Sequence, residues 1–192
     1  IAIMGRNGSG KTTLIKLCTG MIKPTQGVIT FDKLAVNEID SKTLHSKISV
    51  VLQDINLFAG TIRDNILMGR DGINDSILMQ AIDCSGVNDF LTKIPGGLDA
   101  ILMDRGQSLS AGQRQAIAIA RALINQPEIL LMDEPTATLD LNSEQAFVKK
   151  LKPLIQDSTL IAVTHRLPVL ELVDRIIVLA DGKIAIDGPK ED

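Results

Sequence analysis

Positions 5 to 12 read Gly-Arg-Asn-Gly-Ser-Gly-Lys-Thr and carry the strongest chemical signal in the chain. They match the pattern G-x-x-x-x-G-K-[ST], in which glycines let successive backbone N–H groups turn inward around phosphate oxygens. Lys11 adds a cation that can reach the β- and γ-phosphates, and the hydroxyl of Thr12 is placed to ligate Mg²⁺. A glycine-rich turn could match by chance, but an apolar run precedes this one and a helical pattern follows it. The residues predicted to bind a nucleoside triphosphate are Gly5, Arg6, Asn7, Gly8, Ser9, Gly10, Lys11, Thr12 and Thr13.

A second pair of candidate residues, Asp133 and Glu134, follows directly after the apolar run at residues 129–132. Such a run predicts a strand buried on both faces, and ligands of open α/β sheets bind at the carboxyl ends of such strands. Asp133 is then predicted to hold Mg²⁺ through water, and Glu134 to polarise the attacking water. Two acids after a strand are more often a solvated loop, so this interpretation depends on the phosphate-binding pattern upstream.

Apolar runs and helical patterns alternate along the chain, which predicts an α/β fold with a mostly parallel sheet. We expect strands at residues 1–4, 48–52, 129–132 and 160–163, and helices at residues 12–21 and 143–155. Residues 28–31 are expected to form a strand in an antiparallel edge region. Residues 175–180 and 183–187 predict a terminal hairpin, because the Asp-Gly pair between them favours a tight primed turn. From about residue 61 to residue 126, helix-like segments without a convincing strand indicate a helical lobe inserted in the sheet domain.

Length, charge and hydropathy disfavour several classes of protein. A chain of 192 residues is long enough for one domain with a substantial core and too short for several. The formal net charge of −3 and the absence of a basic run disfavour a surface that coats nucleic acid or anionic lipid. No stretch approaches a membrane span of roughly 18 apolar residues, so we expect these residues themselves to be soluble. Cys18 and Cys84 lack metal-ligand spacing and are expected to be reduced core residues.

The segment Leu109-Ser110-Ala111-Gly112-Gln113 is the most discriminating in the chain. It resembles the LSGGQ signature of ABC-transporter ATPases, and it stands upstream of Asp133 and Glu134, as it does in that family. The predicted helix at residues 113–125 has its dipole oriented to favour a phosphate at the signature end. Its predicted core face is Ala116, Ile119, Ala120 and Leu123. A simple serine cap on a core helix is the structural alternative, and the two interpretations are compatible.

This resemblance extends over essentially the whole chain. It implies a P-loop NTPase fold with a RecA-like, mostly parallel core sheet, antiparallel edge strands and the helical lobe, in a single ABC ATPase domain at residues 1–192. Gln53, after a predicted strand, matches the Q-loop and is expected to touch Mg²⁺ and the attacking water. Residues 138–140 match the D-loop, and His165 matches the switch histidine, which contacts the γ-phosphate across from Glu134. The implied catalytic residues are Glu134, His165 and Gln53, and the implied Mg²⁺ ligands are Thr12, Gln53 and Asp133. The signature residues implied to act on the ATP of a partner domain are Ser110, Ala111, Gly112 and Gln113. Asp140 is the implied D-loop residue.

The resemblance also implies partners. In the family, two ATPase domains pair head to tail, and each signature caps the γ-phosphate of the ATP held by the other domain's loop, which implies a homodimer with ATP and Mg²⁺ as cofactors. Residues 57–66 are similar to the segment after the Q-loop in exporters, and residues 114–123, 133–136 and 172–191 are most similar to type I secretion exporters, particularly those that move large adhesin-like proteins. This implies an ATP-hydrolysing motor at the cytoplasmic face of the inner membrane, with a membrane domain of the same parent chain expected before Ile1, a periplasmic adaptor, an outer-membrane channel and no nucleic acid.

Three departures from the family pattern bear on activity. Ala111 replaces the first glycine of the signature, which is costly if that residue needs a positive φ and mild otherwise. Asp104 stands where the family has a glutamate-containing stretch, so the coupling role of that position is open. The family's adenine-stacking aromatic would lie before Ile1, so we expect these residues alone to bind nucleotide weakly.

Two other functions stay open: a soluble ABC-type ATPase acting on nucleic acid, for which long insertions and a basic face are missing, and a regulatory module without turnover, which Ala111 motivates.

Overall fold

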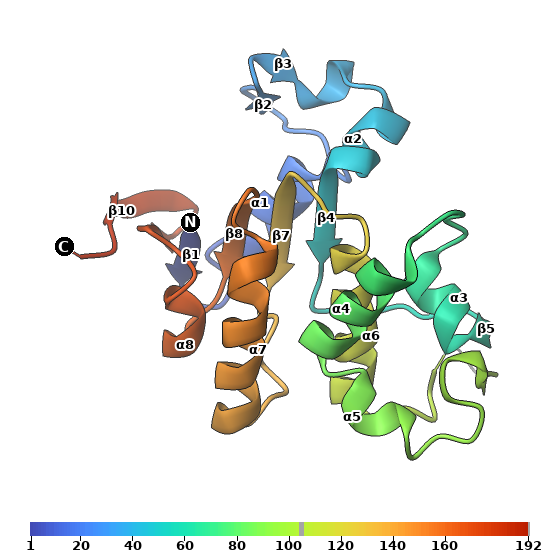
Figure 1. Cartoon of the computed structure of the whole chain (residues 1–192). Coiled ribbons are helices and arrows are strands. Elements are labelled where there is room, and N and C mark those ends of the chain that lie inside the picture. The colour runs from blue at the N-terminus through green and yellow to red at the C-terminus, as the bar shows by residue number, and fades with distance from the viewer. Residues whose placement is uncertain (104–105, 192) are drawn as a thin grey trace.

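The computed structural model describes residues 1–103 and 106–191, and its centre is a six-stranded sheet with the strand order β10-β9-β1-β8-β7-β4 (Figure 1). Its strands are β1 (Ala2–Gly5), β4 (Ile48–Val51), β7 (Ile129–Asp133), β8 (Thr159–Val163), β9 (Arg175–Ala180) and β10 (Lys183–Pro189). Strands β4, β7, β8, β1 and β9 pair in parallel, whereas β10 pairs antiparallel with β9 at one edge. The predicted α/β fold with a mostly parallel sheet is therefore confirmed.

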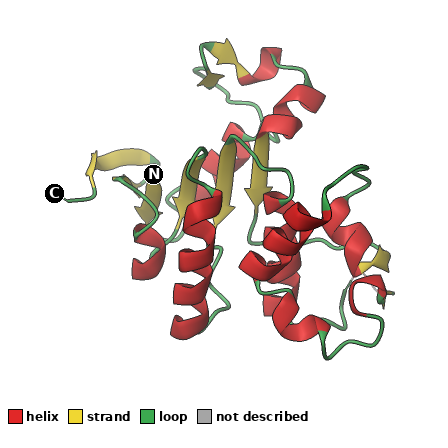
Figure 2. Ribbon diagram, viewed as in Figure 1, coloured by secondary structure: helices red, strands yellow, loops and turns green. Residues whose placement is uncertain are grey.

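Helices cover both faces of this sheet (Figure 2). They are α1 (Lys11–Cys18), α2 (Ser41–Lys47), α3 (Ile62–Leu67), α4 (Asp75–Ser85), α5 (Asn88–Leu91), α6 (Ala111–Leu123), α7 (Leu141–Leu154) and α8 (Leu167–Leu170), with 3₁₀ turns at Val36–Glu38 and Gly97–Asp99. Along β7, Leu130 and Met132 join the cluster that holds the buried side chains of α6, α7 and α8, while Leu131 joins Ile15 of α1 and Leu44 of α2. Because both faces are covered, the strand is a continuous apolar run and not an alternating one.

The helices α3, α4 and α5 form a lobe beside the sheet, with α6 between the lobe and strand β4 (Figure 1). This position buries α6 on almost every side, including its predicted core face. Two short strands, β5 (Gly60–Thr61) and β6 (Ile101–Leu102), pair antiparallel in this region, where the sequence predicts none. Pairs of two residues leave no alternation of apolar and polar side chains to detect. Asp104, in the departure noted above, lies outside the described residues.

Other boundaries also differ from the prediction. Helix α1 ends at Cys18 rather than at residue 21, because Thr19 caps it and Gly20 takes a φ of 73° that does not continue a helix. Residues 28–31 contribute only β2 (Thr30–Phe31), which pairs with β3 (Leu34–Ala35) in a separate two-stranded sheet. The terminal hairpin is confirmed, and β10 continues to Pro189.

Two expectations from composition can be compared with the structure. Across the described parts of the chain, no helix combines the length and the apolar character that a membrane span needs. Cys18 and Cys84 are both free thiols, Cys84 buried and Cys18 partly buried, as the sequence predicts.

Candidate active site

The phosphate-binding pattern forms the turn from β1 into α1, at the carboxyl end of a central strand. Gly5 has a φ of 149°, and a Cβ there would lie 2.3 Å from the backbone oxygen of Leu179, so only glycine fits. Gly8 and Gly10 have φ values of 82° and 99°, in the left-handed region that favours glycine. Gly10 is also the N-cap of α1 and offers no side-chain hydrogen bond to the first N–H groups of the helix. Those groups are thereby open to an anion, which is the arrangement that binds phosphate.

Two side chains of this loop, those of Lys11 and Ser9, differ in their polar partners. Lys11 folds back so that its Nζ donates to the backbone oxygens of Gly5 at 2.8 Å and Arg6 at 2.9 Å. Ser9 is buried, and its Oγ has no hydrogen-bond partner among the described residues. A buried hydroxyl without a partner costs free energy, so a bound phosphate oxygen would satisfy a group that the fold leaves unpaired.

The residues predicted to share Mg²⁺ are brought into contact from distant parts of the chain. Thr12 Oγ1 donates to Asp133 Oδ2 at 2.6 Å, and Asp133 is 2% exposed at the end of β7. These oxygen ligands fit Mg²⁺, which keeps several waters and takes substrate phosphates as further ligands. Residues 1–103 and 106–191 hold no group of three or more His, Cys, Asp or Glu that could cage a metal. Gln53, the third predicted ligand, is exposed just after β4 and is not brought into hydrogen-bond contact with either residue in the part of the chain described.

Glu134 and His165 meet at the ends of the neighbouring strands β7 and β8. His165 Nδ1 lies 2.9 Å from Glu134 Oε1, with the imidazole exposed and the carboxylate mostly covered. The Glu134 N–H donates to the backbone oxygen of Val163 at 2.9 Å, and Glu134 has a φ of 51°, which non-glycine residues rarely adopt. Its Oε2 is buried without a partner among the described residues. A strained backbone and an unpaired buried oxygen at one residue are typical of functional sites.

The signature segment begins α6, with Ser110 as the N-cap. The Ser110 N–H donates to Gln113 Oε1 at 2.8 Å, and the Gln113 N–H donates to Ser110 Oγ at 3.2 Å, which is a capping box. Ala111 is the first residue of the helix and does not have a positive φ, so the replacement of glycine is the mild one. A Cβ on Gly112 would lie 3.7 Å from Thr138 Oγ1, which places the signature beside the D-loop of the same chain. Within the described residues, no hydrogen bond joins the signature to the phosphate-binding loop.

Asp140, at the end of the D-loop, caps α7. Its carboxylate accepts hydrogen bonds from the Ser143 hydroxyl at 2.6 Å and from the N–H groups of Asn142 and Ser143 at 3.0 and 3.1 Å. The hydrogen bonds from Ser143, that of the hydroxyl first, hold the pKa of Asp140 below its ordinary value. A local structural role thus accounts for Asp140, beside the partner-facing role that the resemblance implies.

Sequence motifs single out neither Glu144 nor Arg166, yet both lie beside the site. Glu144 on α7 is 1% exposed and forms an ion pair with Arg166 at 3.3 Å. Arg166 directly follows His165 and contacts the D-loop backbone. A glutamate in a polar stretch of helix looks solvated in the sequence, and only the fold shows that it is buried.

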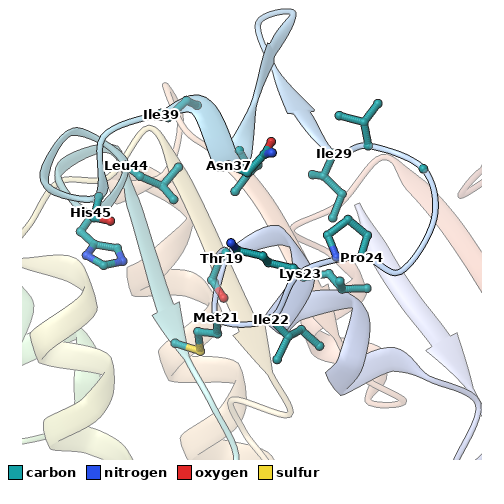
Figure 3. Close-up of a pocket in the computed structure, with 16 residues that line it drawn as sticks. Thr19, Met21, Ile22, Lys23, Pro24, Ile29, Asn37, Ile39, Leu44 and His45 are labelled. Atoms are coloured by element: carbon teal, nitrogen blue, oxygen red, sulfur yellow. The ribbon is translucent and has the colours of Figure 1, made fainter.

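A cavity of about 570 Å³ lies away from these residues, between the end of α1 with the loop that follows it and the segment at residues 27–45 (Figure 3). Thr19, Ile29, Leu44 and His45 are among the residues that line it. Its lining includes no residue of the phosphate-binding loop and neither carboxylate of the pair at 133–134. The site is therefore assigned by its chemistry and not by the size of a cavity.

Known proteins are similar to this chain in both sequence and fold. The family described as "ABC transporter" has a sequence model that matches residues 1–137. The chain is 37% identical over 191 residues to the ABC transporter ATP-binding protein MG015 homolog of Mycoplasma pneumoniae, a match that covers 100% of this chain and 30% of that protein. It is also 37% identical over 191 residues to the cyclolysin secretion/processing ATP-binding protein CyaB of Bordetella pertussis, covering 100% of this chain and 27% of CyaB.

A solved structure extends this similarity to three dimensions. The structure of a bacterial Atm1-family ABC exporter with ATP bound matches with a TM-score of 0.90 and 35% identity, covering 97% of this chain and 33% of that one. The chain therefore spans about a third or less of the length of the proteins it matches.

Proposed function

Because the chain belongs to the ABC transporter ATPase family, we propose that its site hydrolyses ATP to drive a membrane exporter. The observation that carries this proposal is the placement of five side chains at the carboxyl ends of β1, β7 and β8, namely Lys11, Thr12, Asp133, Glu134 and His165. A phosphate-binding loop with its lysine, two oxygen ligands for a cation, and a carboxylate beside an imidazole are the parts that phosphoryl transfer to water requires.

Each residue has a role in this reaction. The loop N–H groups and Lys11 bind and orient the phosphates, and Thr12, Asp133 and Gln53 would hold Mg²⁺. Mg²⁺ held by these residues would neutralise charge that develops on the phosphate oxygens during transfer. Glu134 accepts the proton of the attacking water, and its left-handed backbone conformation orients the carboxylate. His165 orients Glu134 and contacts the γ-phosphate.

We assign the other half of each site to a second copy of the chain, placed head to tail. The N-terminus of α6, with Ser110, Ala111, Gly112 and Gln113, favours a phosphate through its dipole and its N–H groups. In support, no hydrogen bond of the described residues ties the signature to the phosphate-binding loop of its own chain. Asp140, beside the signature, would face the same partner. Ala111 still replaces a glycine of the signature, but its ordinary backbone adds no strain there, which weakens the case for a module without turnover.

We further propose that the exporter is of the type I secretion kind. Support comes from CyaB, which is named for secretion of cyclolysin and is similar to all of this chain through 27% of its own length. In this proposal the parent protein contributes a membrane domain, the ATPase works at the cytoplasmic face of the inner membrane, and a periplasmic adaptor and an outer-membrane channel complete the path. Residues 57–66, beyond Gln53, are the proposed contact with the membrane domain.

The catalytic assignment is tested by Glu134→Gln in the full-length protein that carries this chain. The amide cannot accept the proton of the attacking water, so ATP turnover should fall at least about 100-fold while ATP still binds. The matched control is Glu128→Gln, because Glu128 is an exposed carboxylate just before β7 that pairs with Lys47. Wild-type turnover in Glu134→Gln would contradict the assignment.

The secretion assignment is tested in cells. Deletion of the gene should remove one or more large proteins from the culture medium, and the wild-type gene but not Glu134→Gln should restore them. An unchanged set of secreted proteins after deletion would contradict type I secretion and leave the ATPase assignment standing.

A further inference from the structure

Arg166 connects the segment of His165 to the D-loop through contacts that no sequence motif predicts. Its Nη1 donates to the backbone oxygen of Leu139 at 3.1 Å, and its Nη2 donates to that of Ala137 at 3.1 Å. The Arg166 backbone N–H donates to Thr164 Oγ1 at 3.0 Å, across the position of His165. One guanidinium therefore reaches from the end of β8 to the loop between β7 and α7.

A buried carboxylate holds this guanidinium in place. Glu144 pairs with Arg166 through Oε2 at 3.3 Å, and its Oε1 accepts the hydroxyl hydrogen bond of Thr136. The Glu144 N–H donates to the backbone oxygen of Asp140 at 2.9 Å. A buried carboxylate is tolerated when it is paired and hydrogen-bonded, and both conditions are met here. Arg166 is thus bound by two carbonyls and one carboxylate, all from residues 137–144.

We propose that Arg166 is a positioning residue that couples the position of the switch histidine, His165, to the position of the D-loop, residues 138–140. The loop that Arg166 binds starts at Glu134, directly after β7. Within this loop, the Ala137 N–H donates to the Glu134 backbone oxygen at 3.2 Å. His165 contacts the side chain of the same Glu134. The consequence rests on the proposed function: a D-loop placed by the second copy sets the position of His165 beside the γ-phosphate.

The loss of this residue should affect turnover and not nucleotide binding. Among the described residues, Arg166 makes no hydrogen bond with the phosphate-binding loop. Removal of its contacts therefore leaves the phosphate site intact and misplaces the groups that act on the γ-phosphate. A misplacement of this kind lowers kcat at nearly constant KM, whereas a purely structural defect lowers the amount of folded protein.

The first variant is Arg166→Lys in the full-length protein. Lysine keeps a positive charge beside Glu144, but its single ammonium cannot replace a planar fork that serves two carbonyls and a carboxylate. We expect kcat to fall about tenfold while KM for ATP and ATP affinity stay within about twofold. The matched control is Arg175→Lys, which breaks another two-pronged pair, with Asp187 at 2.7 Å for both bonds, in the remote hairpin of β9 and β10. It should keep wild-type kcat and KM.

The second variant combines Arg166→Met with Glu144→Gln. It removes the guanidinium together with the charge that the guanidinium neutralises, so no unpaired buried charge is left to unfold the chain. We expect kcat to fall about as far as in Arg166→Lys. Wild-type kcat in the double variant would mean that Arg166 only neutralises Glu144, and it would overturn the proposal. Wild-type kcat in Arg166→Lys would overturn it too, as would a change in the KM for ATP as large as the change in kcat.

Hydrogen exchange separates a failure of this inference from a failure of the proposed function. The N–H groups of Ala137 and Leu139 donate within the loop, to Glu134 at 3.2 Å and Thr136 at 3.0 Å. In Arg166→Lys both amides should exchange faster than in the wild type and in Arg175→Lys. If the wild-type protein hydrolysed no ATP, the proposed function would fail, and faster exchange would still support the link between the two segments. Unchanged exchange at both amides would overturn that link whatever the turnover.

Discussion

Replacing Glu134 with glycine should stabilise the folded chain while it removes hydrolysis. Glu134 has a φ of 51°, and left-handed backbone costs a non-glycine residue about 1 to 2 kcal/mol. Its buried Oε2, unpaired among the described residues, adds a desolvation cost of about 1 to 3 kcal/mol. Against these gains stand the lost contact with His165, about 1 kcal/mol, and the greater freedom of glycine in the unfolded chain, also about 1 kcal/mol.

The expected balance is a free energy of unfolding about 1 kcal/mol higher in Glu134→Gly. For a chain of this length, that difference raises the melting temperature by about 2 to 4 °C. The assay is urea and thermal unfolding of the 192-residue chain, followed by circular dichroism, with ATP turnover measured in the full-length protein.

Gln126→Gly is the matched control for the backbone part of this gain. Gln126 has a φ of 43° and is exposed, so its replacement relieves the left-handed backbone without releasing a buried carboxylate. We expect little or no gain from Gln126→Gly, about 1 kcal/mol less than from Glu134→Gly, because the relief of the left-handed backbone and the greater freedom of glycine in the unfolded chain nearly cancel. The reasoning would be refuted if Glu134→Gly were less stable than the wild type while Gln126→Gly was not.

Three other perturbations have definite expected outcomes. Ser110→Ala removes half of the capping box with Gln113 and should lower the free energy of unfolding by about 1 kcal/mol in urea unfolding, most of which Ser110→Thr should restore. Arg121→Met should cost about 2 kcal/mol in the same assay, because the guanidinium Nε donates to the backbone oxygen of Asn65 at 2.8 Å, and a loss below about 0.5 kcal/mol would contradict this. Burial raises the pKa of the Cys84 thiol from 9.0 to about 12, so iodoacetamide should label the folded chain about a thousandfold more slowly than the unfolded chain near neutral pH. Because the unfolded thiol loses its proton first, stability should also fall as the pH rises through about 9 toward 12, and a rise in urea stability over that range would count against it.

Much of the fold can be predicted from short stretches of the chain. The apolar runs that became β1, β4, β7 and β8 are continuous because both faces of the sheet are covered, and the Asp-Gly turn of the last hairpin is a local signal. The paired strands β5 and β6 could not be predicted in this way, since two residues are too few to show a period. The end of α1 at Cys18 was missed because Gly20 stops a helix whose apolar pattern continues for one more turn.

By itself, the sequence determined which runs form the central sheet and predicted which residues hold phosphate, because glycine content, a lysine and apolar periodicity act on the local backbone. The tertiary structure decided how those residues meet. Thr12 reaches Asp133 across 121 positions, because the turn after β1 and the end of β7 lie at the same edge of the sheet. No local pattern encodes three other features, which depend on register and packing between distant segments. These are the small cost of alanine at position 111, the left-handed backbone of Glu134 and the contacts of Arg166.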